Sequence, residues 1–333
     1  MASRYKKIKF SLVKWVVKSG MLHLFKVISR QRHIILNFHR VRPHGLPSDP
    51  FDSCPSISVE LFKEILFYLK KHYEIVSVRS FCKRIDQLQP LAAITFDDGW
   101  KDNYEVAFPV LQELKIPATI FITTGKMGSS EPFWQQKLGK LFSSVVNEGG
   151  KEDLEKFRRI LGVDEAEALN SDLYKKIVGK WKSRKHSEIN AKLNIDGWSK
   201  KILSFERALF LSSDDIREMA SRNIEFGSHT VNHVILTTES DAVVESELID
   251  SKKVLEEILG KSIDMLAYPD GAFSNEIIKK AAASGYKLGC TTENVPIGKR
   301  WDPMKSPRID FEWDHLENKD GSLNEYLFKW GIR

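Results

Sequence analysis

Short apolar and β-branched runs recur along the chain, and each has the length of one buried strand. Between several of these runs lie longer stretches with apolar residues at helical spacing. Alternation of strands and helices predicts a parallel sheet, and about seven such units favour a barrel over an open sheet. The predicted strands cover residues 34–38, 75–78, 92–96, 118–122, 224–228, 265–269 and 287–292.

The two clearest helical patterns lie at residues 58–72 and 241–259. Both repeat apolar side chains every three or four residues, which places those side chains on one face of a helix. In a barrel built from such units, we expect functional residues at the carboxyl ends of the strands. The apolar positions are Leu61, Ile65, Leu66 and Leu69 in the first helix, and Val244, Leu248, Leu255 and Leu259 in the second.

One stretch, from about residue 126 to 211, interrupts this alternation. It is charged and helical in pattern, and it contains no convincing strand. We interpret it as a helical insertion after the fourth strand, on the side of the barrel where active-site loops lie. It is either a solvent-exposed addition without a binding role or a surface that contacts another molecule. The second view depends on four aromatic residues, Phe133, Trp134, Trp181 and Trp198.

The basic charge of the chain is concentrated at its N-terminus. Residues 1–32 hold nine Lys or Arg and no Asp or Glu, so residues 33–333 carry −3 although the whole chain carries +6. A mildly acidic body argues against nucleic acid as a partner. We therefore divide the chain into a basic segment, residues 1–32, and one domain, residues 33–333. The apolar share of the chain, 42%, is sufficient for a large core.

The basic segment has apolar residues at helical spacing, among them Phe10, Val13 and Val17. Its charges exclude a transmembrane span, and it lacks the apolar run and the cleavage site of a secretory signal. Two roles stay open: a helix that lies on an anionic membrane surface, and a helix that packs against the domain. The three cysteines are widely spaced and form no C-x-x-C pattern, which suits a reducing compartment. We expect a cytoplasmic protein, with peripheral contact to the inner face of the membrane under the first role.

Adjacent carboxylates end one predicted strand, in the stretch "AITFDDGW" at residues 93–100. Alone, Asp97 and Asp98 fit a solvated turn. Further along, "FGSHTVNH" places His229 and His233 four residues apart, directly after another strand. If that turn is helical, both imidazoles project from one face and can bind one ion, although a lone pair of this kind is often structural. His229 is not followed by the glutamate of an H-E-x-x-H protease motif.

Together these residues supply what metal-assisted amide hydrolysis requires. Two neutral imidazoles and one carboxylate form a three-ligand site that leaves a position for water, and a second carboxylate can accept the proton of that water. Adjacent aspartates suit both tasks, because successive side chains at a strand end point in different directions.

The order and position of the two motifs resemble those of a known family. "TFDDGW" followed by "SHTVNH" is similar to the first two signatures of the NodB-like polysaccharide deacetylases, carbohydrate esterase family four, and the resemblance extends over about residues 33–310. It implies a distorted (β/α) barrel that binds a divalent metal, often zinc, and removes acetyl groups from N-acetylated sugars. It also implies that Asp97 is the general base and that the metal ligands are Asp98, His229 and His233.

The third signature of the family is matched with one departure. "AYPDG" at residues 267–271 has Ala267 where the family usually has an arginine that orients and balances the charge of the base. We regard Arg308, in "SPRID", as the candidate substitute, and its alternative role is an ordinary surface ion pair. The resemblance further implies that the peptide N–H of Asp270 is the backbone donor to the oxyanion.

The general acid is expected after the first strand. "ILNFHRV" at residues 35–41 resembles the circularly permuted arrangement of the poly-N-acetylglucosamine deacetylases, whose acid histidine comes from the first strand. This implies that His39 protonates the departing amine, while the alternative is that His39 only caps the strand. A later histidine, His315, lies in a polar C-terminal stretch.

These observations predict a metal-dependent N-deacetylase, with zinc as the expected ion. Its substrate is expected to be an N-acetylated sugar in a polysaccharide, an oligosaccharide or a glycolipid precursor. Two alternatives stay open, because the same site could hydrolyse another small amide or a formamide, or the chain could be a catalytically inactive barrel that binds glycans. The complete set of base and metal ligands argues against the inactive barrel, since a binding module does not need all four residues.

Overall fold

The computed structural model describes residues 33–43, 45, 49–193, 209–295, 297, 301–311, 313–318 and 321–332. The basic segment, residues 1–32, and Trp198 lie outside these ranges, so the expectations for them stay predictions. In the part of the chain that is described, no helix has both the length and the apolar composition needed to cross a bilayer.

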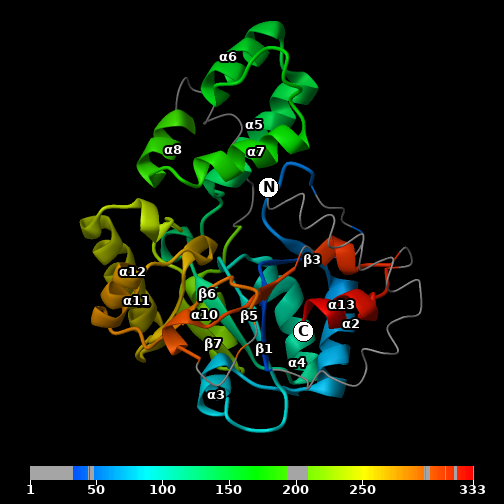
Figure 1. Cartoon of the computed structure of the whole chain (residues 1–333), viewed down its shortest axis with the longest axis vertical. Coiled ribbons are helices and arrows are strands. Elements are labelled where there is room, and N and C mark those ends of the chain that lie inside the picture. The colour runs from blue at the N-terminus through cyan, green and yellow to red at the C-terminus, as the bar shows by residue number, and fades with distance from the viewer. Residues whose placement is uncertain are drawn as a thin grey trace.

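A curled parallel sheet forms the centre of the molecule, with helices packed around it (Figure 1). Seven strands follow one another in the order β10-β1-β5-β6-β7-β8-β9, and the short β4 pairs with the first half of β5. The predicted (β/α) barrel of about seven strands is therefore confirmed. The bounds are β1 (Ile34–Phe38), β4 (Glu74–Ile75), β5 (Leu91–Phe96), β6 (Ala118–Ile122), β7 (Ile224–Ser228), β8 (Met265–Ala267), β9 (Leu288–Cys290) and β10 (Ile309–Asp310); a second sheet pairs β2 (Arg40–Arg42) with β3 (Ser56–Ser58).

One stretch of chain connects the two edges of the sheet. Ser306 forms a parallel bridge with Cys290 at the end of β9, and a few residues later β10 pairs with β1. The Ser306 N–H donates to the Gly289 carbonyl at 2.7 Å, and the Thr291 N–H donates to the Ser306 carbonyl at 2.8 Å. Residues 306–310 thus close the curled sheet, so that both of its edges find hydrogen-bond partners.

The strand residues alternate between two faces of the sheet. On β5, Ile94 packs under the surrounding helices in the largest core cluster, whereas Ala93 belongs to a separate cluster on the inner face. The two-residue period continues that inner face from Ala93 through Thr95 to Asp97, and all three are buried. The first carboxylate of the acidic pair therefore enters the barrel at the carboxyl end of β5.

The helices at the two strongest apolar patterns form as predicted. α2 (Val59–His72) buries all four predicted apolar residues and begins after Ser58, whose side chain accepts a hydrogen bond from the Leu61 N–H. α11 (Asp241–Leu259) buries Val244, Leu248 and Leu255. The other helices beside the barrel are α3 (Val78–Lys83), α4 (Phe108–Leu114), α10 (Ser213–Ala220), α12 (Asn275–Ala283) and α13 (Glu325–Gly331).

The predicted strand at residues 75–78 is wrong over most of its length. The strand β4 ends at Ile75, and the Ser77 side chain accepts a hydrogen bond from the Ser80 N–H, which caps α3. A local cap therefore overrides the β-branched composition of this run. The strands predicted at residues 265–269 and 287–292 form, but they shorten to β8 and β9.

The described residues between β6 and α10 contain a group of four helices at one end of the barrel (Figure 1). Phe133, Trp134 and Trp181 form no exposed contact surface, because each is at most 5% exposed, although Trp134 lines a cleft between these helices and the barrel. Trp134 and Trp181 belong to the helices' own core, while Phe133 packs against Trp100 and Phe210. The four helices are α5 (Trp134–Glu148), α6 (Lys151–Leu161), α7 (Ser171–Trp181) and α8 (His186–Leu193).

We expect Gly227→Ala to destabilise the protein. On β7, a Cβ at this position would lie 2.6 Å from the Phe121 ring and 2.9 Å from the Met265 carbonyl oxygen. Such overpacking costs about 1–3 kcal/mol, which urea unfolding of the variant should reveal. Gly179→Ala is the matched control, since a Cβ there meets no atom within 4 Å and alanine favours the helix by about 0.5–1 kcal/mol. Equal stability of the two variants would contradict the close packing at β7.

Candidate active site

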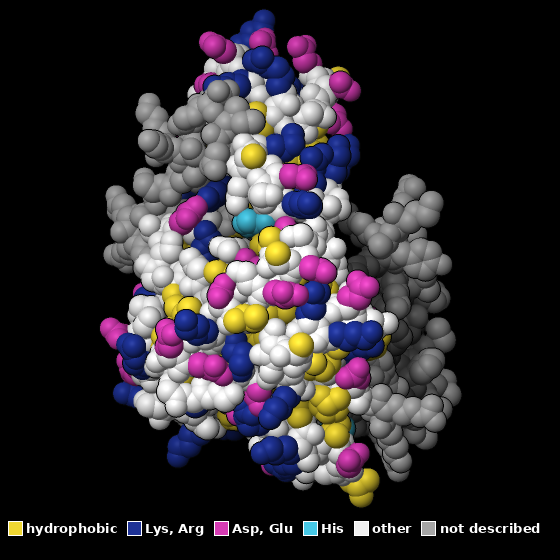
Figure 2. Space-filling view, turned by 90° about the vertical axis from the view of Figure 1, so that its left-hand side faces the viewer, with side chains coloured by type: hydrophobic (Ala, Val, Ile, Leu, Met, Phe, Trp, Pro, Cys, Tyr) yellow, Lys and Arg dark blue, Asp and Glu magenta, His cyan; other side chains and the backbone are white. Residues whose placement is uncertain are grey.

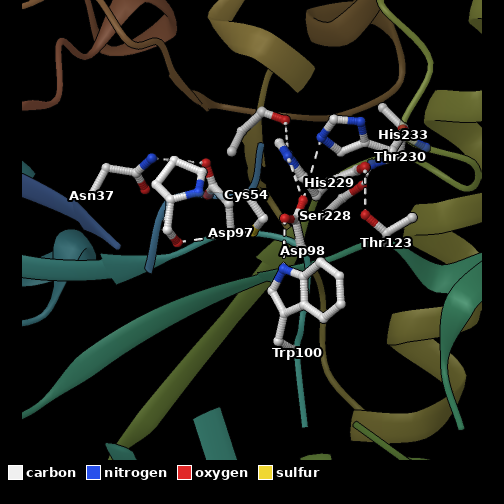
Figure 3. Close-up of polar contacts among 12 residues, drawn as sticks. Asn37, Cys54, Asp97, Asp98, Trp100, Thr123, Ser228, His229, Thr230 and His233 are labelled. Carbon is white, nitrogen blue, oxygen red and sulfur yellow. Dashed lines mark hydrogen bonds and ion pairs between the residues drawn. The ribbon is translucent and has the colours of Figure 1, made fainter. Parts of the chain in front are cut away.

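Asp97 and Asp98 follow β5 directly, and their side chains point in different directions (Figure 3). Asp98 has a φ of 74° and Gly99 a φ of 79°, so the chain turns sharply as it leaves the strand. At Gly99 a Cβ would also lie 2.9 Å from Ile122 Cδ1. The turn therefore requires glycine, and it separates the two carboxylates.

A buried arginine holds Asp97. Arg308 Nη1 and Nη2 donate to Asp97 Oδ1 and Oδ2, each at 2.7 Å, and Asn37 Nδ2 donates to Oδ2 at 3.1 Å. Arg308 is 0% exposed, so a surface ion pair does not describe this contact. Burial favours a higher pKa for Asp97, but attraction and hydrogen bonds from Arg308 outweigh it and hold the pKa well below its ordinary value. Asp97 is therefore ionised at neutral pH.

Asp98, His229 and His233 form a compact group of potential metal ligands. Asp98 Oδ1 lies 3.6 Å from His229 Nε2 and 3.3 Å from His233 Nε2. Its Oδ2 accepts a hydrogen bond from Trp100 Nε1 at 2.8 Å, whereas Oδ1 is buried and has no hydrogen-bond partner among the described residues. A buried carboxylate oxygen without a donor is costly. A cation between this oxygen and the two imidazoles would satisfy it.

Both histidines are suited to bind a metal. Burial lowers the pKa of His229 and of His233 to about 4, so both imidazoles are neutral at neutral pH, as ligands must be. His229 Nδ1 lies 2.8 Å from the Ala267 carbonyl oxygen. Because a carbonyl can only accept, Nδ1 carries the proton and leaves the Nε2 lone pair for an ion. The residues present therefore fit a divalent ion bound by two nitrogens and one oxygen.

The loop that carries the two histidines is not the helical turn that the spacing suggested. Thr230 and His233 have φ values of 66° and 58°. The His233 N–H donates to Thr230 Oγ1 at 3.1 Å, and Glu247 on α11 accepts hydrogen bonds from the Val231 and Asn232 N–H groups at 2.8 and 2.9 Å. A loop folded around a buried carboxylate thus brings the imidazoles together, with their ring centroids 4.8 Å apart.

His39 lies at the same rim of the barrel. Burial raises the pKa of Asp98, and His39 is close enough to oppose that effect electrostatically. The His39 Nδ1 atom is buried and has no hydrogen-bond partner among the described residues. Its carbonyl oxygen accepts a hydrogen bond from Asn103 Nδ2 at 2.8 Å, which fixes the backbone where β1 ends. The structure therefore brings His39 to the site without binding its ring to another described residue.

Asp270 follows β8, in the turn Pro269–Gly271, and has a φ of 57°. Its carboxylate forms an ion pair with Lys182, which follows α7 in the insertion. The role predicted for Asp270 concerns only its peptide N–H, so this ion pair does not compete with that role. The pair does connect the third sequence motif directly to the insertion.

Several residues that shape the site were not predicted. Asn37 is a polar residue inside an apolar strand, and Glu247 is a charged residue on the buried face of α11, so both left a visible signal in the sequence. For Trp100 and Phe210, no pattern in the sequence indicates that these two residues contact each other. Their rings stack with centroids 4.6 Å apart, although one follows β5 and the other ends the insertion.

The end of the insertion supports the turn after β5. Phe210 pairs with Trp100 in an antiparallel bridge, and the Leu211 N–H donates to the Gly99 carbonyl at 2.9 Å. Trp100 in turn donates to Asp98. The insertion is therefore joined to the group of potential metal ligands through both backbone and side chain.

A narrow cleft opens between the insertion and the barrel. The barrel contributes His233 and Asp270 to its lining, and the insertion contributes Lys182, Arg184 and His186. In the space-filling view, a histidine is visible in the hollow where the helical end meets the body of the molecule (Figure 2). A ligand in this cleft would contact the insertion and one of the two histidines of the site.

Comparison with known proteins identifies relatives of this chain. A sequence profile described as Polysaccharide deacetylase matches residues 84–289. The poly-beta-1,6-N-acetyl-D-glucosamine N-deacetylase of Staphylococcus aureus is 23% identical over 307 residues, which cover 88% of this chain and 84% of that protein. The protein YxkH of Bacillus subtilis is 24% identical over 200 residues, which are 60% of this chain and only 44% of YxkH.

Two solved structures share the fold over most of their length. The deacetylase PplD of Streptococcus pyogenes, in complex with acetate, has a TM-score of 0.58 at 20% identity and covers 90% of this chain and 98% of its own. IcaB from Ammonifex degensii has a TM-score of 0.56 at 18% identity and covers 92% of this chain and 99% of its own. At such identities these likenesses support the fold alone.

We expect Arg308→Met to lower the free energy of unfolding by about 3–5 kcal/mol, because it leaves the Asp97 charge buried without its partner. The double variant Asp97→Asn/Arg308→Met should recover much of that loss, since no unpaired charge remains. Arg217→Met, which removes an exposed ion pair with Asp214, is the control and should cost less than about 1 kcal/mol. Urea unfolding measures these three and the single variant Asp97→Asn. A loss in the double variant equal to the sum of the two single losses at the buried pair would contradict the assignment.

Proposed function

Because the chain belongs to the polysaccharide deacetylase family, we propose that it is a metal-dependent hydrolase that removes the acetyl group from an N-acetylated sugar. The arrangement of the adjacent carboxylates carries this proposal. Asp97 is ionised against a buried arginine, while Asp98 presents to two neutral imidazoles an oxygen that has no donor among the described residues. A barrel that only binds glycans needs neither feature. The relative in Staphylococcus aureus supports an N-acetylglucosamine polymer as substrate, and a glycolipid precursor is the other candidate.

The proposed metal ligands are Asp98, His229 and His233. Zinc suits them, because two imidazoles and one carboxylate with an open position are typical of catalytic zinc sites. When bound, the ion supplies Lewis acidity, which polarises the amide carbonyl and makes a water molecule more acidic. The hydrogen bonds from Trp100 to Asp98 and from His229 to the Ala267 carbonyl orient two of the ligands.

Each remaining residue has one step in the proposed reaction. Asp97 accepts a proton from the attacking water as the water oxygen bonds to the acetyl carbon. The Asp270 N–H donates to the oxyanion that develops on the carbonyl oxygen. His39 gives a proton to the nitrogen, so the C–N bond breaks and the sugar leaves as a neutral amine beside acetate. Arg308 keeps Asp97 ionised until it accepts this proton, and its two hydrogen bonds hold the carboxyl group in place.

Release of acetate from a panel of N-acetylated and N-formylated sugars tests the function. We expect the metal-loaded protein to release acetate from an N-acetylglucosamine oligomer or a lipid-linked N-acetylated sugar. Formate without acetate would instead assign formamide hydrolysis to the site. Glycan binding without release of either acid would support the inactive barrel.

We predict about one divalent ion per purified chain, since the potential ligands form one group in the described structure. The double variant His229→Ala/His233→Ala should lose that ion, because a single carboxylate binds a divalent cation weakly. His72→Ala, at the end of α2, is the control and should retain it. Elemental analysis of the folded proteins provides the measurement, and full metal content in the double variant would rule out this ligand set.

His39→Ala should lower kcat by about 10²- to 10⁴-fold, the range typical of a lost general acid. A substrate analogue whose departing amine is less basic should recover part of this loss, because that amine needs less help from a proton donor. His315→Ala, at an exposed histidine, should leave kcat unchanged. Steady-state kinetics with both substrates measure the effect, and an equal loss with both would assign His39 a structural role.

A further inference from the structure

A half-buried arginine lines the cleft, and its guanidinium has no partner among the residues that the structure describes. Arg184 lies between α7 and α8 and lines the cleft between the insertion and the barrel. Its guanidinium forms no hydrogen bond or ion pair with the described residues, although other arginines of the domain, such as Arg79 and Arg84, bind carboxylates bidentately. A guanidinium has donors that fit two oxygens of one anion, so Arg184 is a candidate to bind one.

The backbone on both sides of Arg184 is attached to neighbouring elements. The Arg184 N–H donates to the Trp181 carbonyl at 2.9 Å, and its own carbonyl accepts a hydrogen bond from Thr238 Oγ1 at 3.4 Å. Two residues later, the His186 N–H donates to Glu239 Oε1 at 2.7 Å. Contacts to the insertion and to the barrel thus fix the loop that presents the guanidinium.

The other charges of the described cleft lining are compensated. Lys182 and Asp270 neutralise each other in an ion pair. Burial lowers the pKa of His186. Among the described residues that line the cleft, no carboxylate is left to pair with Arg184, and the nearby Glu239 accepts its hydrogen bond from the His186 N–H.

We propose that Arg184 binds an oxyanion carried by the substrate, either a phosphate or a carboxylate, while the acetamide group of the same molecule occupies the metal site. His233 and Arg184 line one cleft, so a glycan that reaches the first can contact the second. This inference rests on the proposed function and narrows its substrate class to acidic N-acetylated glycans or glycolipids. Arg184 is then a specificity-determining residue that acts in binding.

The test uses one N-acetylglucosamine oligomer in three forms: neutral, carrying a phosphate, and carrying a carboxylate. The parent protein should show a lower KM for an acidic form than for the neutral form. Arg184→Gln should raise the KM for that acidic form about 10- to 100-fold more than the KM for the neutral form, which is the size expected for the loss of a charge-assisted contact. The kcat values should change little. The acidic form that shows this effect identifies the oxyanion.

Arg159→Gln is the matched control, because Arg159 is exposed on α6 of the same insertion and does not line the cleft. It should behave as the parent does with all three forms. Equal KM values for neutral and acidic forms in the parent, or equal losses for both in Arg184→Gln, would overturn the inference.

Calorimetric binding of the three forms separates this inference from the proposed function. If no form releases acetate, the proposed function fails. Tighter binding of an acidic form that Arg184→Gln abolishes still supports the oxyanion site. Binding without preference for an acidic form overturns it.

Discussion

The buried pair of Asp97 and Arg308 is the constraint on which the rest of the site depends. An unpaired charge inside the barrel would cost several kcal/mol, so each of these side chains requires the other. Asp97 follows β5 and Arg308 precedes β10, and β1 lies between these two strands in the sheet. Their contact therefore fixes the closing segment of the barrel relative to its central strands. Asp98, by contrast, places Oδ1 within 3.6 Å of His229 Nε2 and 3.3 Å of His233 Nε2.

The strands and the two principal motifs were predictable because their signals are local. A buried strand needs a short apolar run, and a residue directly after such a run lies at the carboxyl edge of a parallel sheet. Asp97, Asp98 and His229 each follow such a run, so the sequence alone predicts that they lie at one edge. It did not establish the partner of Asp97, because the chain between β9 and β10 carries no periodic pattern, and Arg308 could be proposed only from the family's missing arginine at Ala267.

What the sequence did not reveal depends on contacts between distant segments. The turn between His229 and His233 is set by Glu247, a residue of the following helix, and not by a helical preference of the turn itself. Likewise, Phe133 looked available for contact because the segment that buries it, around Phe210, returns from the far end of the insertion. The same return joins the insertion to Asp98 through Trp100. The insertion is therefore part of the framework of the site as well as one wall of its cleft.

Comparison of Asp97→Asn with Asp98→Asn tests most directly whether the two carboxylates have separate roles, one as general base and the other as metal ligand. Both substitutions keep the side-chain shape and remove one charge, so the two folded variants can be compared by elemental analysis and by acetate release. We predict that Asp97→Asn retains the metal and loses about 10²- to 10⁴-fold in turnover, whereas Asp98→Asn loses both metal and turnover. Loss of metal from both variants alike, or turnover within a few-fold of the parent in Asp97→Asn, would contradict this prediction.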